Sequence, residues 1–85
     1  MSNATYEGWK NRQTWNVALW INNEYPWYQA AVKFMEVNPD TRNPYKAFVV
    51  SQGLASERTP DRIAFMSTRL DYDELNAMMK ELITK

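Results

Sequence analysis

The residues best suited to recognition chemistry lie in the stretch NRQTWNVALWI, residues 11–21. The stretch places a guanidinium group and several polar and indole side chains within about three helical turns. Arg and Trp are the side chains most enriched among binding hot spots. As a binding surface, the stretch predicts contacts with a partner, together with the next tryptophan along the chain. The residues expected to make these contacts are Arg12, Asn16, Trp20 and Trp27.

The same stretch can instead serve mainly as core. Apolar residues at helical spacing are most often interior residues, and a helix that is apolar on nearly all sides is normally buried. We therefore expect these side chains to pack inside: Trp15, Val17, Ala18, Leu19 and Ile21. Trp20 lies beside a polar strip, and two interpretations stay open for it. It is either a half-covered ring that donates its indole N–H or an exposed anchor for a partner.

Two polar residues of the stretch need partners. Arg12 falls in the first turn of the expected helix, where its charge meets the positive end of the helix dipole. We expect it to be held by an internal salt bridge or by an external partner. The candidate internal partners are Glu7, Glu24 and the carboxylates near 71–74. Asn16, if buried, must form hydrogen bonds, most simply with a loop backbone; otherwise it orients a partner.

A basic and aromatic segment near the start of the chain offers an alternative site. Aromatic rings beside positive charges can stack on the bases of single-stranded nucleic acid. The residues with this composition are Tyr6, Trp9, Lys10 and Arg12. However, the 10 basic and 10 acidic residues of the chain are interleaved, and strong generic binding to nucleic acid depends on clustered positive charge. A protein partner is therefore favoured over nucleic acid.

The composition argues against catalysis. The chain contains no histidine and no cysteine, so the commonest general base, metal ligand and thiol nucleophile are missing. Asp71, Asp73 and Glu74 could suggest a metal or acid–base site, but carboxylates at a helix start more often cap the helix and complement its dipole. We expect no catalytic residue, no metal, no cofactor and no enzymatic activity.

Local signals predict four helices, at about 12–23, 26–37, 44–52 and 72–84. Asn11 and Asn43 are expected to cap the first and third of these, and Gly53 to close the third in a left-handed conformation. Asp71 and Glu74 form a variant of the capping box before the fourth. No apolar run approaches the roughly 20 residues of a membrane span, so we expect no membrane partner and a cytoplasmic protein.

The predicted fold is all-α: a compact bundle of about four short helices around a buried first helix. We expect one small helical domain over 1–85, with an irregular lead-in at 1–10. Met78 and Met79 fall on the apolar stripe of the last helix and are predicted core residues. The segment 59–70 is ambiguous: TPD at its start is typical of a helix start, and we favour a short helical turn or an extended linker.

The sequence also resembles a family of small uncharacterised proteins of bacteriophages, cyanobacterial viruses among them, and of bacterial genomes. The most specific element is the pattern N-R-x-T-W-N-V-x-L-W-I. It matches Asn11, Arg12, Thr14, Trp15, Asn16, Val17, Leu19, Trp20 and Ile21. The resemblance does not extend to residues 38–58. It implies a small intracellular protein encoded by a virus, and it implies no particular activity.

Together these observations predict a non-enzymatic module that docks on a host or viral protein. An accessory protein for single-stranded nucleic acid is the alternative. A homodimer also stays open, because a chain of 85 residues rich in aromatic rings can complete its core against a second copy of itself.

Overall fold

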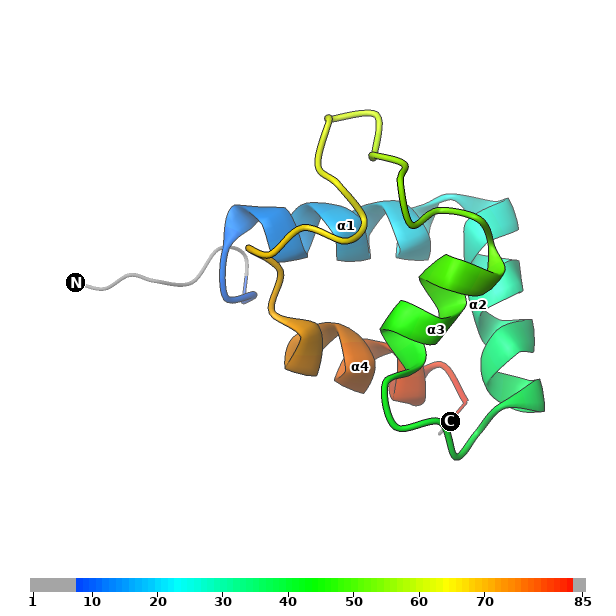
Figure 1. Ribbon diagram of the computed structural model, residues 1–85. Helices are drawn as coiled ribbons and strands as arrows, with labels where there is room; N and C mark the ends of the chain where they lie inside the picture. The colour runs from blue at the N-terminus through cyan, green and yellow to red at the C-terminus, as the bar shows by residue number, and fades with distance from the viewer. Residues whose placement is uncertain (1–7, 84–85) are drawn as a thin grey trace.

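The structure is a computed structural model that describes residues 8–83. Within these residues four α-helices follow one another, and no strand is present: α1 (Arg12–Asn23), α2 (Tyr25–Val37), α3 (Pro44–Ser51) and α4 (Tyr72–Glu81) (Figure 1). The predicted all-α fold with short helices is confirmed. Most of the lead-in expected at 1–10 lies outside the described residues.

Side-chain capping explains where two of the helices begin. The Asn11 carboxamide oxygen accepts a hydrogen bond from the backbone N–H of Thr14, and the Asp71 carboxylate accepts one from Glu74. Asn43 is the N-cap residue of α3, as predicted, but its side chain makes no capping bond. Its Oδ1 accepts instead from the Asn76 amide of α4, at 3.4 Å. Asn43 thus precedes α3 and also joins it to α4.

The sequence also predicts where α3 and α4 end, and the structure confirms the first of these predictions but not the second. Gly53 has a φ of +71° and ends α3 as expected, with the Leu54 N–H donating to the Val49 carbonyl at 2.9 Å. Helix α4 is shorter than predicted. Leu82 and Ile83 donate to carbonyls three residues earlier, which is the tighter pattern that often closes an α-helix.

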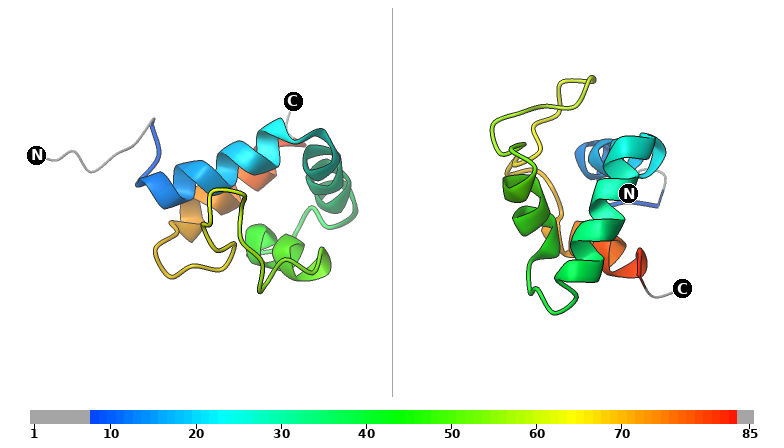
Figure 2. Two further views of the ribbon diagram at one scale, coloured as in Figure 1. Left: turned by 90° about the horizontal axis from the view of Figure 1, so that it is seen from above. Right: turned by 90° about the vertical axis from the view of Figure 1, so that its right-hand side faces the viewer.

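The four helices pack around one core. Helix α1 packs against α2 and α4, while α3 packs against the same two helices from the other side (Figure 2). The long connection between α3 and α4 passes beside α1, and part of it projects beyond the helices (Figure 1). The segment 59–70 contains no helix, so the helix start expected at TPD is wrong. An isolated antiparallel bridge joins Arg58 and Ala64 there.

The buried apolar residues of α1 lie on one face, and Asn16 is buried near the opposite side of the helix. Val17, Ala18 and Ile21 are buried as predicted, whereas Trp15 and Leu19 are only half-buried. The remaining buried residues of this helix are polar: Thr14 and Asn16. Met78 and Met79 of α4 are in the core, as expected.

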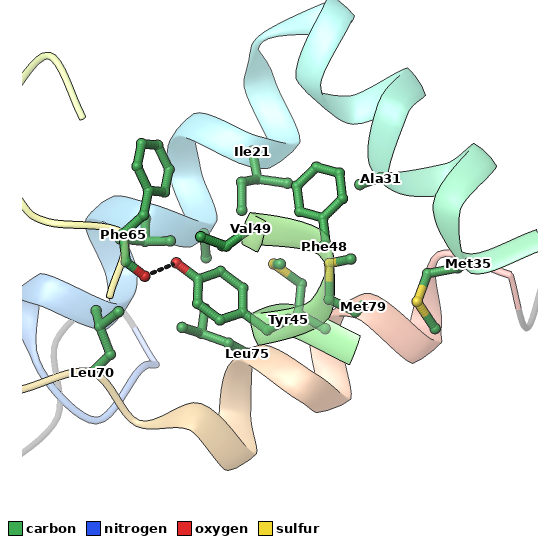
Figure 3. Packing of buried hydrophobic residues seen from close by; sticks show 13 residues of the cluster. Ile21, Ala31, Met35, Tyr45, Phe48, Val49, Phe65, Leu70, Leu75 and Met79 are labelled. Carbon is green, nitrogen blue, oxygen red and sulfur yellow. Dashed lines mark hydrogen bonds between the residues drawn. The ribbon is translucent and has the colours of Figure 1, made fainter. Parts of the chain in front are cut away.

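Tyr45 of α3 lies at the centre of this core. Its side chain is fully buried among apolar residues of all four helices, and its hydroxyl donates to the carbonyl oxygen of Phe65 at 2.6 Å (Figure 3). Burial raises the pKa of this phenol far above its ordinary range, and the neighbouring Tyr72 raises it further. The hydroxyl therefore stays a neutral donor and fixes Phe65, whose ring packs edge-on against Trp27 at 5.3 Å.

We predict that Tyr45→Phe lowers the free energy of unfolding by about 1–3 kcal/mol, because the buried carbonyl of Phe65 loses its donor. Chemical denaturation with circular dichroism detection measures the change. The control is Tyr25→Phe, whose hydroxyl is exposed and should matter by less than about 0.5 kcal/mol. Equal effects of the two substitutions would contradict the structural role of the Tyr45 hydroxyl.

Candidate functional site

The beginning of α1 is tied to the beginning of α4 through two residues of the 11–21 stretch. The Asn11 side chain donates to the carbonyl of Arg69 at 2.7 Å and accepts from the Thr14 hydroxyl, also at 2.7 Å. The Thr14 hydroxyl oxygen in turn accepts from the backbone N–H of Asp71 at 2.9 Å. These bonds fix the chain that enters α4.

Glu74 adds a second link between the same two regions. In a capping box its carboxylate would accept from the N–H of the cap residue, Asp71. Here it accepts from the backbone N–H of Lys10 at 2.7 Å, because the Asp71 N–H already donates to Thr14. The expected reciprocal half of the capping box is therefore wrong. The carboxylate instead holds the chain that enters α1 against α4.

A cluster of polar side chains connects the middle of α1 to the segment after α3, and we call it the polar clamp: Asn16, Trp20, Thr59 and Asp61. The Asn16 side chain is fully buried and is bonded at both ends. Its amide donates to Asp61 Oδ2 at 2.6 Å, and its carbonyl oxygen accepts from the Thr59 hydroxyl at 2.7 Å. The Trp20 indole N–H donates to the same Asp61 oxygen at 3.2 Å.

Charge reinforces the polar clamp. The hydrogen bond from Asn16 is the main reason why the pKa of Asp61 lies below its ordinary value, and the bond from Trp20 lowers the pKa further. Partial desolvation opposes these effects, and the positive charge of Arg12 adds to them. Asp61 is thus a negative charge near Arg12 that the sequence did not suggest, while Glu7, one of the suggested partners, lies outside the described residues.

The polar clamp holds one end of a tight turn. The backbone N–H of Arg62 donates to the Thr59 carbonyl at 2.7 Å, which closes a β-turn over 59–62 with Pro60 in its second position. The Thr59 N–H donates to Ile63 at 2.8 Å, and the Thr59 hydroxyl accepts from the Ile63 N–H at 3.2 Å. Thr59 is therefore buried and fully engaged, although its sequence neighbours on both sides are exposed.

The turn places charged side chains at the molecular surface. Arg58, Asp61 and Arg62 are exposed, and the Arg58 guanidinium donates to the Arg62 carbonyl at 3.4 Å. Arg62 has a φ of +70°, a left-handed conformation that glycine adopts without cost and that costs other residues roughly 1–2 kcal/mol. The exposed chain around this turn, residues 55–62, is called the 55–62 loop below.

The four residues predicted to contact a partner have different surroundings. Arg12 is exposed and lies near enough to Asp61 to influence its charge. Trp20 is half-buried and donates its indole N–H, which is one of the two alternatives that the sequence left open. Trp27 is half-buried and packs on Phe65. Asn16 is completely buried, so it supports the 55–62 loop from beneath rather than reaching the surface.

The described residues of the alternative nucleic-acid site differ in their exposure. Trp9 packs against the core, and the backbone of Lys10 is bound to Glu74. Tyr6 lies outside the described residues. Only the side chains of Lys10 and Arg12 in this set are both described and exposed. The structure therefore does not assemble a continuous stacking surface from the part of this set that it describes.

Sequence analysis missed Thr59, Asp61 and the two arginines of the 55–62 loop. A usable signal was present, because proline at the second position and aspartate after it are typical of β-turns. The same residues also favour helix starts, which is how TPD was interpreted. The hydrogen bonds between α1 and this segment favour the β-turn over the helix start. They join residues that are 41–45 positions apart in the sequence.

The described part of the chain contains neither a group of side chains suited to a metal ion nor a helix suited to span a membrane. Within residues 8–83, no three acidic side chains come together in a way that could hold a metal ion. No helix in this part of the chain has the length and apolar character needed to cross a membrane. What the site offers is guanidinium groups on a fixed backbone, which can pair with carboxylates or phosphates.

Comparison with known proteins identifies a family for this chain. The model of a family of unknown function, DUF7249, matches residues 2–85. Neither a curated protein nor a solved structure matches the chain.

We predict that Asn16→Ala lowers the free energy of unfolding by about 1–3 kcal/mol, because Thr59 loses its buried acceptor and Asp61 its strongest donor. It should also speed hydrogen exchange at the Ile63 N–H. Asn23→Ala, at the exposed end of α1, is the matched control and should change stability by less than about 0.5 kcal/mol. Stability of Asn16→Ala within that limit would show that the clamp does not hold the loop.

We also predict an acid-dependent loss of stability through Asp61. Its pKa is lower in the folded than in the unfolded state, so its stabilising contribution is complete above the unfolded value of about 3.9 and disappears as the pH falls through the folded value. Denaturation of wild type and Asp61→Asn as a function of pH tests this. The difference between the two should be constant near neutral pH and shrink in acid; a difference independent of pH would contradict the assignment.

Proposed function

Since the chain belongs to this family of unknown function, DUF7249, we propose its role from geometry: a non-enzymatic protein-binding module that docks through the 55–62 loop on a host or viral protein. The observation that carries the proposal is the use of a fully buried amide, Asn16, to hold an exposed loop.

The burial of the Asn16 amide adds little to the stability of a small core. A buried polar group stabilises a fold only modestly when all its hydrogen bonds are made, and an apolar residue of similar size often serves as well. Asn16 and Thr59 direct their bonds toward each other and toward the base of the loop. These bonds fix the backbone of the loop before a partner binds. Less conformational entropy is therefore lost on binding.

The surface around the loop supports a protein partner with exposed carboxylates. Arg58 and Arg62 lie in the loop, Arg12 lies near Asp61, and the half-buried ring of Trp20 adjoins them. Arginine and tryptophan at the centre of an interface contribute strongly to binding. Asp61 is engaged by the polar clamp, so the arginines provide the charges that the loop offers to a partner.

The backbone of Arg62 supports the same proposal. Glycine would fit its left-handed conformation without strain, and strained residues in proteins cluster at functional sites. In this proposal the guanidinium of Arg62 contacts the partner, and the binding that it contributes offsets the conformational cost.

The setting that we propose is the cytoplasm of a bacterial host, with the protein encoded by a virus. The pattern N-R-x-T-W-N-V-x-L-W-I and its resemblance to proteins of bacteriophages support this origin. Most polar residues of the pattern contribute to the clamp or to the links between α1 and α4, so the pattern describes how the loop is held.

The test is affinity capture of the tagged protein from host lysate, followed by titration of the captured protein with purified variants. We predict that Arg62→Gly raises the free energy of unfolding by about 1 kcal/mol and weakens binding about tenfold or more, a combination that separates contact from folding. Arg12→Ala should also weaken binding. Lys80→Ala, on the exposed side of α4, is the control and should leave binding unchanged.

Recovery of the same protein at the same affinity with both arginine variants and with the control would contradict the proposal. Capture of single-stranded nucleic acid, with an affinity that falls steeply with salt, would favour the alternative function instead. A protein interface anchored by tryptophan should depend much less on salt.

A further inference from the structure

A second unassigned surface lies on the outer side of α2, away from the 55–62 loop. Tyr25, Tyr28 and Val32 of α2 and Leu82 after α4 line a shallow groove of about 660 Å³, which we call the α2 groove. Tyr25 is 67% exposed, one of the most exposed large apolar side chains among the described residues.

Helix α2 carries its apolar residues on one broad arc. The middle of this arc buries Ala31 and Met35 in the core. At 100° per residue, Tyr28, Val32 and Tyr25 continue the arc toward the outer side of the helix, where Tyr28 and Val32 are half-buried and Tyr25 is exposed. The apolar surface of α2 therefore extends beyond the part that the core covers.

Charge distinguishes this groove from two others on the described part of the chain. The α2 groove contains one positive and one negative side chain, Lys33 and Glu36. A groove beside Trp9 contains two carboxylates, Glu74 and Glu81, and a groove on α3 contains two cations, Arg42 and Lys46. Either of these would repel an identical surface, whereas the α2 groove is neutral and self-complementary.

We propose that the α2 groove is the interface of a homodimer and that its occupant is α2 of a second copy of this chain. Two-fold interfaces bring the same patch of both subunits together, so that each contact occurs twice. Two copies of α2 crossing antiparallel also oppose their helix dipoles favourably. The apolar side chains that line the α2 groove would then be covered in both copies.

The antiparallel arrangement pairs the beginning of each α2 with the end of the other. Tyr25 meets Glu36 of the partner subunit, where its hydroxyl can donate to the carboxylate. Tyr28 meets Lys33 of the partner subunit, where the ring can receive the ammonium group. Each charged side chain of the groove thus has a partner without a like charge opposite it.

The two members of the first pair are far apart within one chain. Tyr25 and Glu36 are on the same side of α2 but about 16 Å apart along its axis, at 1.5 Å per residue. They cannot touch within a monomer. A substitution at one that is rescued by a substitution at the other therefore reports a contact between two copies.

The experiment is sedimentation equilibrium of the purified protein over a wide concentration range. We expect wild type to dimerise, Tyr25→Glu to raise the dissociation constant about tenfold or more because it faces Glu36 of the partner subunit, and Tyr25→Glu with Glu36→Lys to recover most of the affinity. Val50→Glu, an equally exposed apolar position on α3, is the control and should not alter dimerisation.

Circular dichroism establishes that all variants fold, which is expected because the substituted side chains are exposed. A wild-type protein that stays monomeric at every concentration would overturn the proposal and leave the groove to a different partner. Equal effects of Tyr25→Glu and Val50→Glu, or failure of the double variant to recover, would overturn the pairing. None of these results depends on the 55–62 loop.

Discussion

The buried side chain of Asn16 is the interaction on which the arrangement of this molecule depends. An amide without partners in an apolar interior costs more than a satisfied one contributes. The side of helix α1 that carries Asn16 can therefore be buried only when Thr59 and Asp61 are in place. The segment that carries these two residues is held there by the same bonds. Helix α1 and the long connection before α4 therefore depend on each other for their positions.

This dependence explains how a connection without helices or strands is ordered. Its middle is fixed by the polar clamp, and its later part by the hydroxyl of Tyr45, which binds the Phe65 carbonyl. Its end is fixed by Asn11 and Thr14, which bind the backbone at Arg69 and Asp71. Side chains of the helices thus replace the hydrogen bonds that a sheet or helix would supply. The 55–62 loop includes the clamped residues Thr59 and Asp61, and its β-turn over 59–62 is closed by its own backbone hydrogen bond.

Local chemistry made part of this structure predictable. The caps at Asn11 and Asp71, the turn at Gly53 and the apolar stripe with Met78 and Met79 involve neighbours in sequence, and the sequence identified them. Asn16 was expected to bond a loop backbone, but its partners are two side chains that nothing near it specifies. Asn43 and Glu74 have good local roles, and the structure gives each a distant partner instead.

The candidate site shows the same limit. Arg12 and Trp20 were identified by residue type, whereas the loop beside them was missed because Thr-Pro-Asp suits both a helix start and a β-turn. The choice between the two depends on Asn16, which lies far away in sequence. Dependence of this kind is a property of tertiary packing, and a single sequence contains no local signal for it.

The distance along the chain between the two sides of the clamp has a consequence for biosynthesis. Asn16 and Thr14 are translated before Thr59, Asp61 and Asp71, yet their bonds require those residues. Until then, the Asn16 amide has neither of its native partners. The native arrangement of the amino-terminal half therefore forms only after these residues, and the core residues of α4 beyond Asp71, have been translated. This dependence favours one late folding step over progressive folding.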